Sequence, residues 1–150
     1  MGTGTTVNLT IRAADQQQFE LICDGYCGKY KTETGEQTQV AIIEYTFDDV
    51  KYTNLELEDE LQKRKIPYDK NWSFCSEFLG GCQYHRIDNT GANILKRFSD
   101  GEEDQVSFQQ LEEALLNDDF DNFMSKERER LYIMSWEDQD KTLEIKERVQ

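Results

Sequence analysis

The sequence lacks any apolar run close to the roughly 20 residues that a membrane-spanning helix requires. Its first residues, MGTGTT, contain neither the basic start nor the apolar stretch of a secretion signal. We therefore expect neither membrane insertion nor secretion, and a cytoplasmic protein.

Positive charge is scarce along the chain. Seventeen Lys and Arg stand against 31 Asp and Glu, which gives a formal net charge of −14. A negative charge of this size repels nucleic-acid phosphates and anionic lipid surfaces at long range. Direct binding to nucleic acid or membranes is therefore not expected, whereas a basic protein partner is. The acidity also has an ordinary explanation, because net charge keeps a small protein soluble.

The motifs of nucleotide and calcium sites are missing. The sequence contains neither G-x-x-x-x-G-K-[ST] nor G-x-G-x-x-G, whose glycine-rich backbones hold phosphates. The run Asp119-Phe120-Asp121 continues into Asn122-Phe123, without the glycine that an EF-hand calcium loop requires at its sharp turn. We expect no cofactor. With 31 acids in the chain, no pair of carboxylates identifies itself as a catalytic site.

Histidine and cysteine are few, and they define one alternative site. Cys75, Cys82 and His85, the only histidine, offer the thiolate and imidazole ligands that zinc prefers. Their spacing is not that of a zinc knuckle, and Cys82 and His85 would point to opposite faces of a strand. A Cys–His nucleophile and base pair also lacks a recognisable third, orienting residue. The simpler interpretation is that these cysteines are structural thiols. Cys75 and Cys82 could form a disulfide under oxidising conditions.

Apolar residues suffice for one core. The 150 residues are 37% hydrophobic and 11% aromatic, which suits a single domain that buries about two-thirds of its unfolded surface. Apolar residues alternate with polar ones over residues 7–11, and again at Phe19, Leu21 and Cys23, which predicts two strands. A third run, residues 40–47, has apolar residues on both faces and predicts a central strand covered on both sides.

A helix and a β meander are predicted next. Asn54 can cap a helix in which acids come first, bases last, and Leu57 and Leu61 stand one turn apart; Pro67 ends it shortly after Lys65. The meander that follows has these expected parts: strands marked by Trp72, Phe74 and Phe78, a hairpin turn at Gly80-Gly81, a strand over residues 82–87, a turn over residues 88–91, and a third strand at NILKRF.

The last third is predicted to be helical. Ser107 and Gln110 form a capping box for a helix with an apolar stripe of Phe108, Leu111 and Leu115. Residues 117–119 interrupt it. A second helix follows, and candidates for its buried side are Phe120, Phe123, Met124, Leu131 and Ile133 or Met134. The charged tail after Trp136 is expected to be frayed or loosely docked.

These elements predict a single α+β domain over residues 1–150, with helices packed on one side of an antiparallel sheet. Residues 1–99 supply the sheet and one helix, and residues 100–150 form an acidic helical region. That region contains sixteen acids and six bases, a net charge of −10, which leaves −4 for the rest of the chain. Acids three or four residues apart on a helix lie about 5–6 Å from each other, a spacing of the same order as successive phosphates in nucleic acid.

Helices of this kind can present negative charge to a basic groove, although a solvated helix face gives the same pattern. The candidate partner-binding residues are Glu112, Glu113, Asp118, Asp119, Phe120, Asp121, Phe123 and Trp136. The acids would give fast, salt-sensitive association, and aromatic anchors such as Phe120, Phe123, Tyr132 or Trp136 would supply affinity.

One stretch carries a family resemblance. A helix ending in Lys63-Arg64-Lys65, then Ile66-Pro67-Tyr68-Asp69 and Trp72 before a glycine-containing hairpin, resembles small uncharacterised proteins carried by plasmids and phages. The likeness covers roughly residues 55–98. It implies a setting among mobile elements and the systems that attack or protect them, and it implies no activity.

The sequence therefore favours a non-enzymatic acidic binding or inhibitor protein that occupies a basic surface of a nucleic-acid-handling partner. DNA-mimicking anti-restriction and anti-CRISPR proteins and toxin immunity proteins belong to this class. One alternative is a small metal-binding regulator or enzyme built on Cys75, Cys82 and His85. Another is a structural or assembly protein of a phage or plasmid system.

Overall fold

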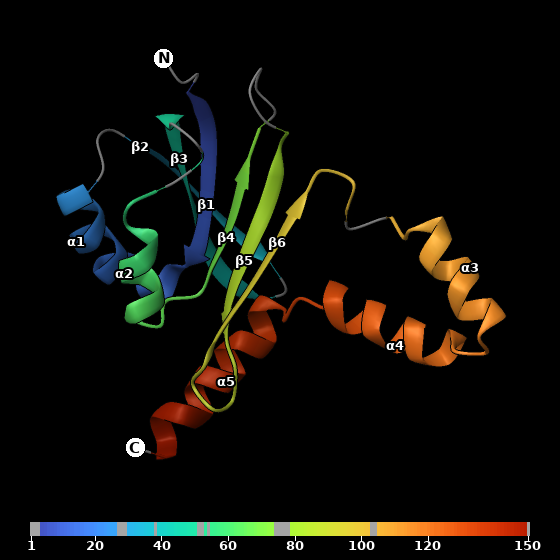
Figure 1. The fold of residues 1–150 in the computed structure, drawn as a ribbon. Helices are drawn as coiled ribbons and strands as arrows, with labels where there is room; N and C mark the ends of the chain where they lie inside the picture. Colours follow the sequence, from blue (N-terminus) through green and yellow to red (C-terminus); the bar gives the residue numbers. More distant parts are fainter. Residues whose placement is uncertain are drawn as a thin grey trace.

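Six strands form one antiparallel sheet in the computed structural model, which describes residues 4–26, 30–37, 39–50, 53, 55–73, 79–102 and 105–149 (Figure 1). The order across the sheet is β2-β3-β1-β4-β5-β6. The strands are β1 (Thr5–Arg12), β2 (Tyr30–Gln37), β3 (Val40–Val50), β4 (Tyr68–Trp72), β5 (Gly81–Ile87) and β6 (Asn93–Ser99). The helices are α1 (Gln16–Tyr26), α2 (Glu58–Lys63), α3 (Phe108–Leu116), α4 (Phe120–Leu131) and α5 (Trp136–Val149), and a 3-10 turn at Ala13–Asp15 precedes α1. This is the predicted α+β fold, with a helical C-terminal third.

The alternation of β1 places its apolar residues in the core. Val7, Leu9 and Ile11 are each 0% exposed, and Leu9 pairs with Tyr45 of β3 on one side and Lys70 of β4 on the other. The predicted two-sided strand is also confirmed in β3. Its buried residues divide between a cluster beneath α1 and α2 and a smaller cluster formed by Val40, Ile42 and Trp136. Apolar side chains of one strand therefore hold helices on both faces of the sheet, so the expectation that the helices pack on one side only is wrong.

The strand predicted at Phe19, Leu21 and Cys23 is wrong, because these residues belong to α1. Phe19, Ile22 and Cys23 are buried, whereas Leu21 is 69% exposed. The buried positions follow the i, i+3, i+4 spacing of a helix face rather than strand alternation.

α2 is shorter than the predicted helix. It begins at Glu58 and ends at Lys63, while Leu57 and Leu61 are both fully buried, as their spacing predicts. The helix ends before Pro67, and Lys65, between the two, has a left-handed backbone with a φ of 60°. The predicted cap, Asn54, lies outside the described residues.

The predicted meander is confirmed in β4, β5 and β6, but its first turn is corrected. Gly81 is the first residue of β5 and pairs with Trp72, the last residue of β4, so it lies in a strand and the turn predicted at Gly80-Gly81 is wrong. A Cβ on Gly81 would lie 2.6 Å from a ring carbon of Trp72 and 2.5 Å from the carbonyl oxygen of Phe98. Glycine at this position therefore allows the Trp72 ring to lie over the backbone of β5. Phe74 and Phe78 lie outside the described residues.

The turn between β5 and β6 is formed as predicted. Asp88 Oδ1 accepts hydrogen bonds from the backbone N–H groups of Thr90 and Ala92 at 2.8 and 2.9 Å, and Gly91 has a φ of 89°. An aspartate that accepts from nearby backbone N–H groups is a common way to stabilise a tight turn.

The tail after Trp136, predicted to be frayed or loosely docked, is instead helix α5, and its first turns are anchored to the sheet. Trp136 is 3% exposed and packs with Val40 and Ile42, on the face opposite α1 and α2. Gln139 accepts from the N–H of Ile87 at 2.8 Å and donates to its carbonyl oxygen at 3.0 Å. No helix in the described part of the chain is both long and apolar enough to cross a membrane.

Candidate protein interface and polar cleft

α3 and α4 form a helical hairpin that projects beyond β6, away from α1 and α2 (Figure 1). The capping box is confirmed, because Ser107 Oγ accepts from the N–H of Gln110 at 3.4 Å. The turn after α3 is a Schellman motif, in which Asp118 donates to Leu115 and Asp119 donates to Ala114 through backbone hydrogen bonds. Asp118 occupies the left-handed position of this motif with a φ of 55°. The acidic turn at residues 117–119 therefore reverses the chain and ties the two helices together.

Two of the three residues of the predicted apolar stripe of α3 are exposed and the third, Leu111, is half-buried, so the stripe is not the buried face that its spacing predicts. Phe108 is 76% exposed and Leu115 is 59% exposed, and the adjacent Leu116 is 77% exposed. Only Ala114 of α3 is buried, and no residue of α4 is, although Phe123 and Met124 are half-buried. Exposed apolar side chains gathered on one element commonly mark a surface that contacts another protein.

All five candidate acids of this region are exposed, and none of them forms an ion pair with another described residue; they are Glu112, Glu113, Asp118, Asp119 and Asp121. Of the neighbouring acids, Glu127 is neutralised by Arg130 at 2.7 Å. The five carboxylates therefore keep their charge available to another molecule.

Only part of the candidate set lines one hollow. A groove of about 350 Å³ between α3 and α4 is lined by Glu113, Asp119, Phe123, Lys126 and Glu127, among others. The remaining hairpin candidates are exposed on the hairpin and do not line this groove; they are Glu112, Asp118, Phe120 and Asp121. The candidate interface is therefore the hairpin surface as a whole, with one acidic groove in it.

Trp136 does not belong to this surface. Its indole is buried at the start of α5, and the guanidinium carbon of Arg86 lies 4.2 Å from its ring centroid. Trp136 is therefore a core residue, and the prediction that it is an exposed partner-binding anchor is wrong. Tyr132, by contrast, is 59% exposed at the end of α4.

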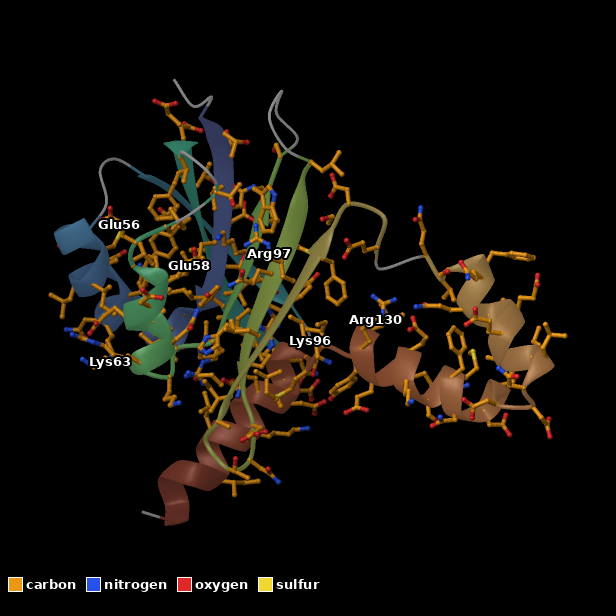
Figure 2. The ribbon with its side chains drawn as sticks, in the orientation of Figure 1. Glu56, Glu58, Lys63, Lys96, Arg97 and Arg130 are labelled. Atoms are coloured by element: carbon orange, nitrogen blue, oxygen red, sulfur yellow. The ribbon has the colours of Figure 1, made fainter. Side chains whose placement is uncertain are left out.

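A lysine of β6 connects the C-terminal end of α4 to the sheet. Lys96 of β6 lies beside the C-terminal end of α4, the helix that carries Arg130 (Figure 2). Its ammonium donates to the carbonyl oxygens of Glu129 and Tyr132, each at 2.6 Å. A cation at this helix end satisfies carbonyl groups that have no partner within the helix and interacts favourably with the helix dipole.

The alternative cysteine and histidine site gains no geometric support from the described residues. His85 is fully buried, with Nδ1 2.8 Å from the carbonyl oxygen of Ile66 and Nε2 3.1 Å from Asn93 Oδ1. Cys82 and His85 differ by three positions on β5 and so project from opposite faces. No cluster of three metal-ligating side chains occurs among the described residues, and Cys75 is not one of them.

Sequence reasoning missed a second site, a polar cleft between α2 and the β4–β6 part of the sheet. It has a volume of about 320 Å³ and is lined by Glu58, Asp59, Gln62, Lys70, Gln83 and Arg97, among others. The register places Lys70, Gln83 and Arg97 in one row across β4, β5 and β6. The sequence does contain one signal for this site. Lys70 stands between Tyr68 and Trp72 in a strand pattern, so alternation places a lysine on the inward face, where lysines are rarely found unless they are paired.

Glu58 is the hub of the hydrogen bonds beneath this cleft. Its carboxylate accepts from Lys70 Nζ at 2.8 Å, from the Tyr68 hydroxyl at 3.1 Å, from Gln83 at 3.3 Å and from the N–H of Leu55 at 3.1 Å. Burial and the Glu58 charge raise the pKa of Tyr68, which keeps the phenol protonated as a donor. Burial lowers the pKa of Lys70, and Glu58 opposes that effect.

Comparisons with protein-family models, with curated proteins and with solved structures find no match for the chain.

Proposed function

We propose that the protein is a non-enzymatic binding protein that docks its α3–α4 hairpin onto a basic surface of a nucleic-acid-handling protein. The observation that carries the proposal is the combination found on this hairpin. Five exposed carboxylates without an ion pair among the described residues stand beside exposed Phe108, Leu115 and Leu116. Apolar anchors surrounded by charge are the composition expected of a protein interface.

Charge complementarity selects the partner. The chain carries a net charge of −14, and the acidic C-terminal region holds most of it, so a basic groove would attract this region at long range. A groove that normally binds nucleic acid has this charge. Occupying it would block nucleic-acid binding, which is how DNA-mimicking anti-restriction and anti-CRISPR proteins act, and toxin immunity proteins use a related strategy.

Assembly of many copies of this chain is a less favourable function for the same surface. The exposed apolar side chains could pair with those of a second copy. However, two hairpins brought together would place their unpaired carboxylates close to each other, and like charges in contact oppose association.

The test neutralises charge on the hairpin and, separately, an equal charge elsewhere. A partner is captured from a host lysate with the wild-type chain as bait and purified, and its dissociation constant is measured at low and high salt. The hairpin variant is D118N/D119N/D121N; asparagine also tolerates the left-handed backbone of residue 118. The control variant is D24N/E56Q/E144Q, which removes three exposed acids from other parts of the chain.

We expect the hairpin variant to bind at least about tenfold more weakly than wild type at low salt, with a smaller salt dependence. The control variant should retain wild-type affinity. Equal weakening of both variants would show that binding depends on the net charge of the protein and not on the hairpin acids. Unchanged binding of the hairpin variant would refute the proposed contact.

A further inference from the structure

Arg97 is an arginine whose hydrogen-bonding capacity is largely unused. Its guanidinium carbon lies 4.5 Å from the centroid of the Trp72 ring, so the planar group is held over the indole (Figure 2 labels Arg97 on β6). A guanidinium has five N–H donors. The hydrogen bond found among the described residues is one to Gln83 Oε1, at 3.5 Å. The other donors of the fork have no acceptor among the described residues and are available to a ligand, and the contact with the Trp72 ring restrains the guanidinium beforehand.

Gly81 makes this arrangement possible. Trp72 pairs with Gly81, and Gly81 pairs with Ser99, two residues along the strands from the row that contains Arg97 and therefore on the same face of the sheet. Without a side chain at Gly81, the indole can lie close to the backbone of β5, where its ring contacts Arg97.

A second cation faces the same cleft. Lys70 Nζ lies 5.5 Å from the centroid of the same Trp72 ring, and its ammonium has one acceptor among the described residues, Glu58 Oε2. Glu58 is already shared among four donors, so its charge is committed to the network beneath the cleft. The two cations face the same cleft, and, although burial and Glu58 have larger effects on the pKa of Lys70, the Arg97 charge lowers it. An anion between them would interact favourably with both cations.

We propose that this cleft binds a small metabolite through a carboxylate or phosphate group, which the Arg97 guanidinium grips in bidentate fashion beside Lys70. Planar and tetrahedral oxyanions both match the guanidinium fork. The volume of about 320 Å³ suits a small molecule rather than a polymer. Asp59 and Gln62 of α2 form the opposite wall and would contact the remainder of the ligand. The site is separate from the α3–α4 hairpin and does not depend on its function.

The test uses nuclear magnetic resonance on the full-length ¹⁵N-labelled protein at constant ionic strength, with inorganic phosphate and acetate as separate probes against chloride. The reporter is the indole N–H of Trp72, which donates to the carbonyl oxygen of Leu79 at 3.1 Å. We expect saturable shifts of this resonance and of the β5 and β6 amides. The probe with the lower dissociation constant then identifies the preferred oxyanion.

Two variants separate the guanidinium fork from charge alone. R97Q should weaken binding by about tenfold or more, and R97K, which keeps the charge but lacks the planar fork, should weaken it to an intermediate degree. R130Q, which removes an exposed arginine of α4, should bind as wild type does. Linear, unsaturable shifts, or equal affinity of R97Q and wild type, would overturn the proposal.

Discussion

Lys70 Nζ lies 2.8 Å from Glu58 Oε2, and this ion pair joins β4 to α2 with side chains that are only 2% and 9% exposed. Breaking a buried pair from one side leaves an uncompensated charge in a medium that solvates it poorly. We therefore expect Glu58→Leu to lower the free energy of unfolding by about 3 kcal/mol, measured by urea denaturation.

The double variant E58L/K70M removes both charges, and it should be more stable than E58L alone. Glu60→Ala is the matched control, because Glu60 pairs with Arg64 at 2.7 Å on the surface of the same helix. That exposed pair is expected to contribute no more than about 0.5 kcal/mol. A double variant no more stable than E58L would show that shape, rather than unpaired charge, dominates the cost.

His85 is expected to make stability depend on pH. Burial is the largest effect on its pKa and lowers it, although the carbonyl oxygens of Ile66 and Asn93 favour the protonated ring. The unfolded chain then takes up the proton at a higher pH than the folded one, starting near the ordinary histidine pKa of about 6.5. The stabilisation by neutral His85 is therefore present above that pH and lost as the pH falls below it.

The measurement compares wild type with His85→Gln, because the many carboxylates titrate alike in both. The unfolding free energy of wild type minus that of His85→Gln should decrease as the pH falls from about 7.5 to about 5.5. A difference that instead grows in favour of wild type at acid pH would mean that the two acceptors stabilise an imidazolium more than burial opposes it.

The sequence predicts an element correctly where the pattern of adjacent residues alone determines which side chains are buried. Val7, Leu9 and Ile11 alternate, and they form a strand with its apolar face buried. The stretch from Phe19 to Cys23 fits strand alternation at three positions and helix spacing at three, and only packing against β1 and β3 separates the two. Such short apolar patterns are ambiguous until the rest of the fold is known.

The site was less predictable, because its features depend on residues distant in sequence. Gly81 was predicted as a turn residue, but its role is set by the Trp72 ring and the backbone of Phe98. The exposed acids of the hairpin were predicted as a group, since charge density is visible in the sequence. The burial of Trp136 was not, since it arises from Val40 and Ile42, almost a hundred residues away.

Lys96 is expected to control the base of the hairpin. Its ammonium bridges the carbonyl oxygens of Glu129 and Tyr132 and lies 5.8 Å from the Tyr132 ring centroid. Lys96→Met should lower the unfolding free energy by about 1–2 kcal/mol and speed hydrogen exchange in the last turn of α4. Lys126→Met, at an exposed lysine of the same helix that lines the α3–α4 groove, is the control and should leave exchange there unchanged. Equal exchange in wild type and Lys96→Met would show that the contact does not hold α4.

Leu116 should separate binding from stability. Its side chain is 77% exposed, so Leu116→Ser is expected to change the unfolding free energy by less than about 0.5 kcal/mol. If the hairpin surface is an interface, the same change removes an apolar anchor and should weaken partner binding by about tenfold, read by calorimetry with the purified partner. Leu21→Ser is the matched control, because Leu21 is a helical leucine that is 69% exposed on α1. The two variants should be equally stable, and only Leu116→Ser should bind poorly. Identical binding by both would place the interface elsewhere on the molecule.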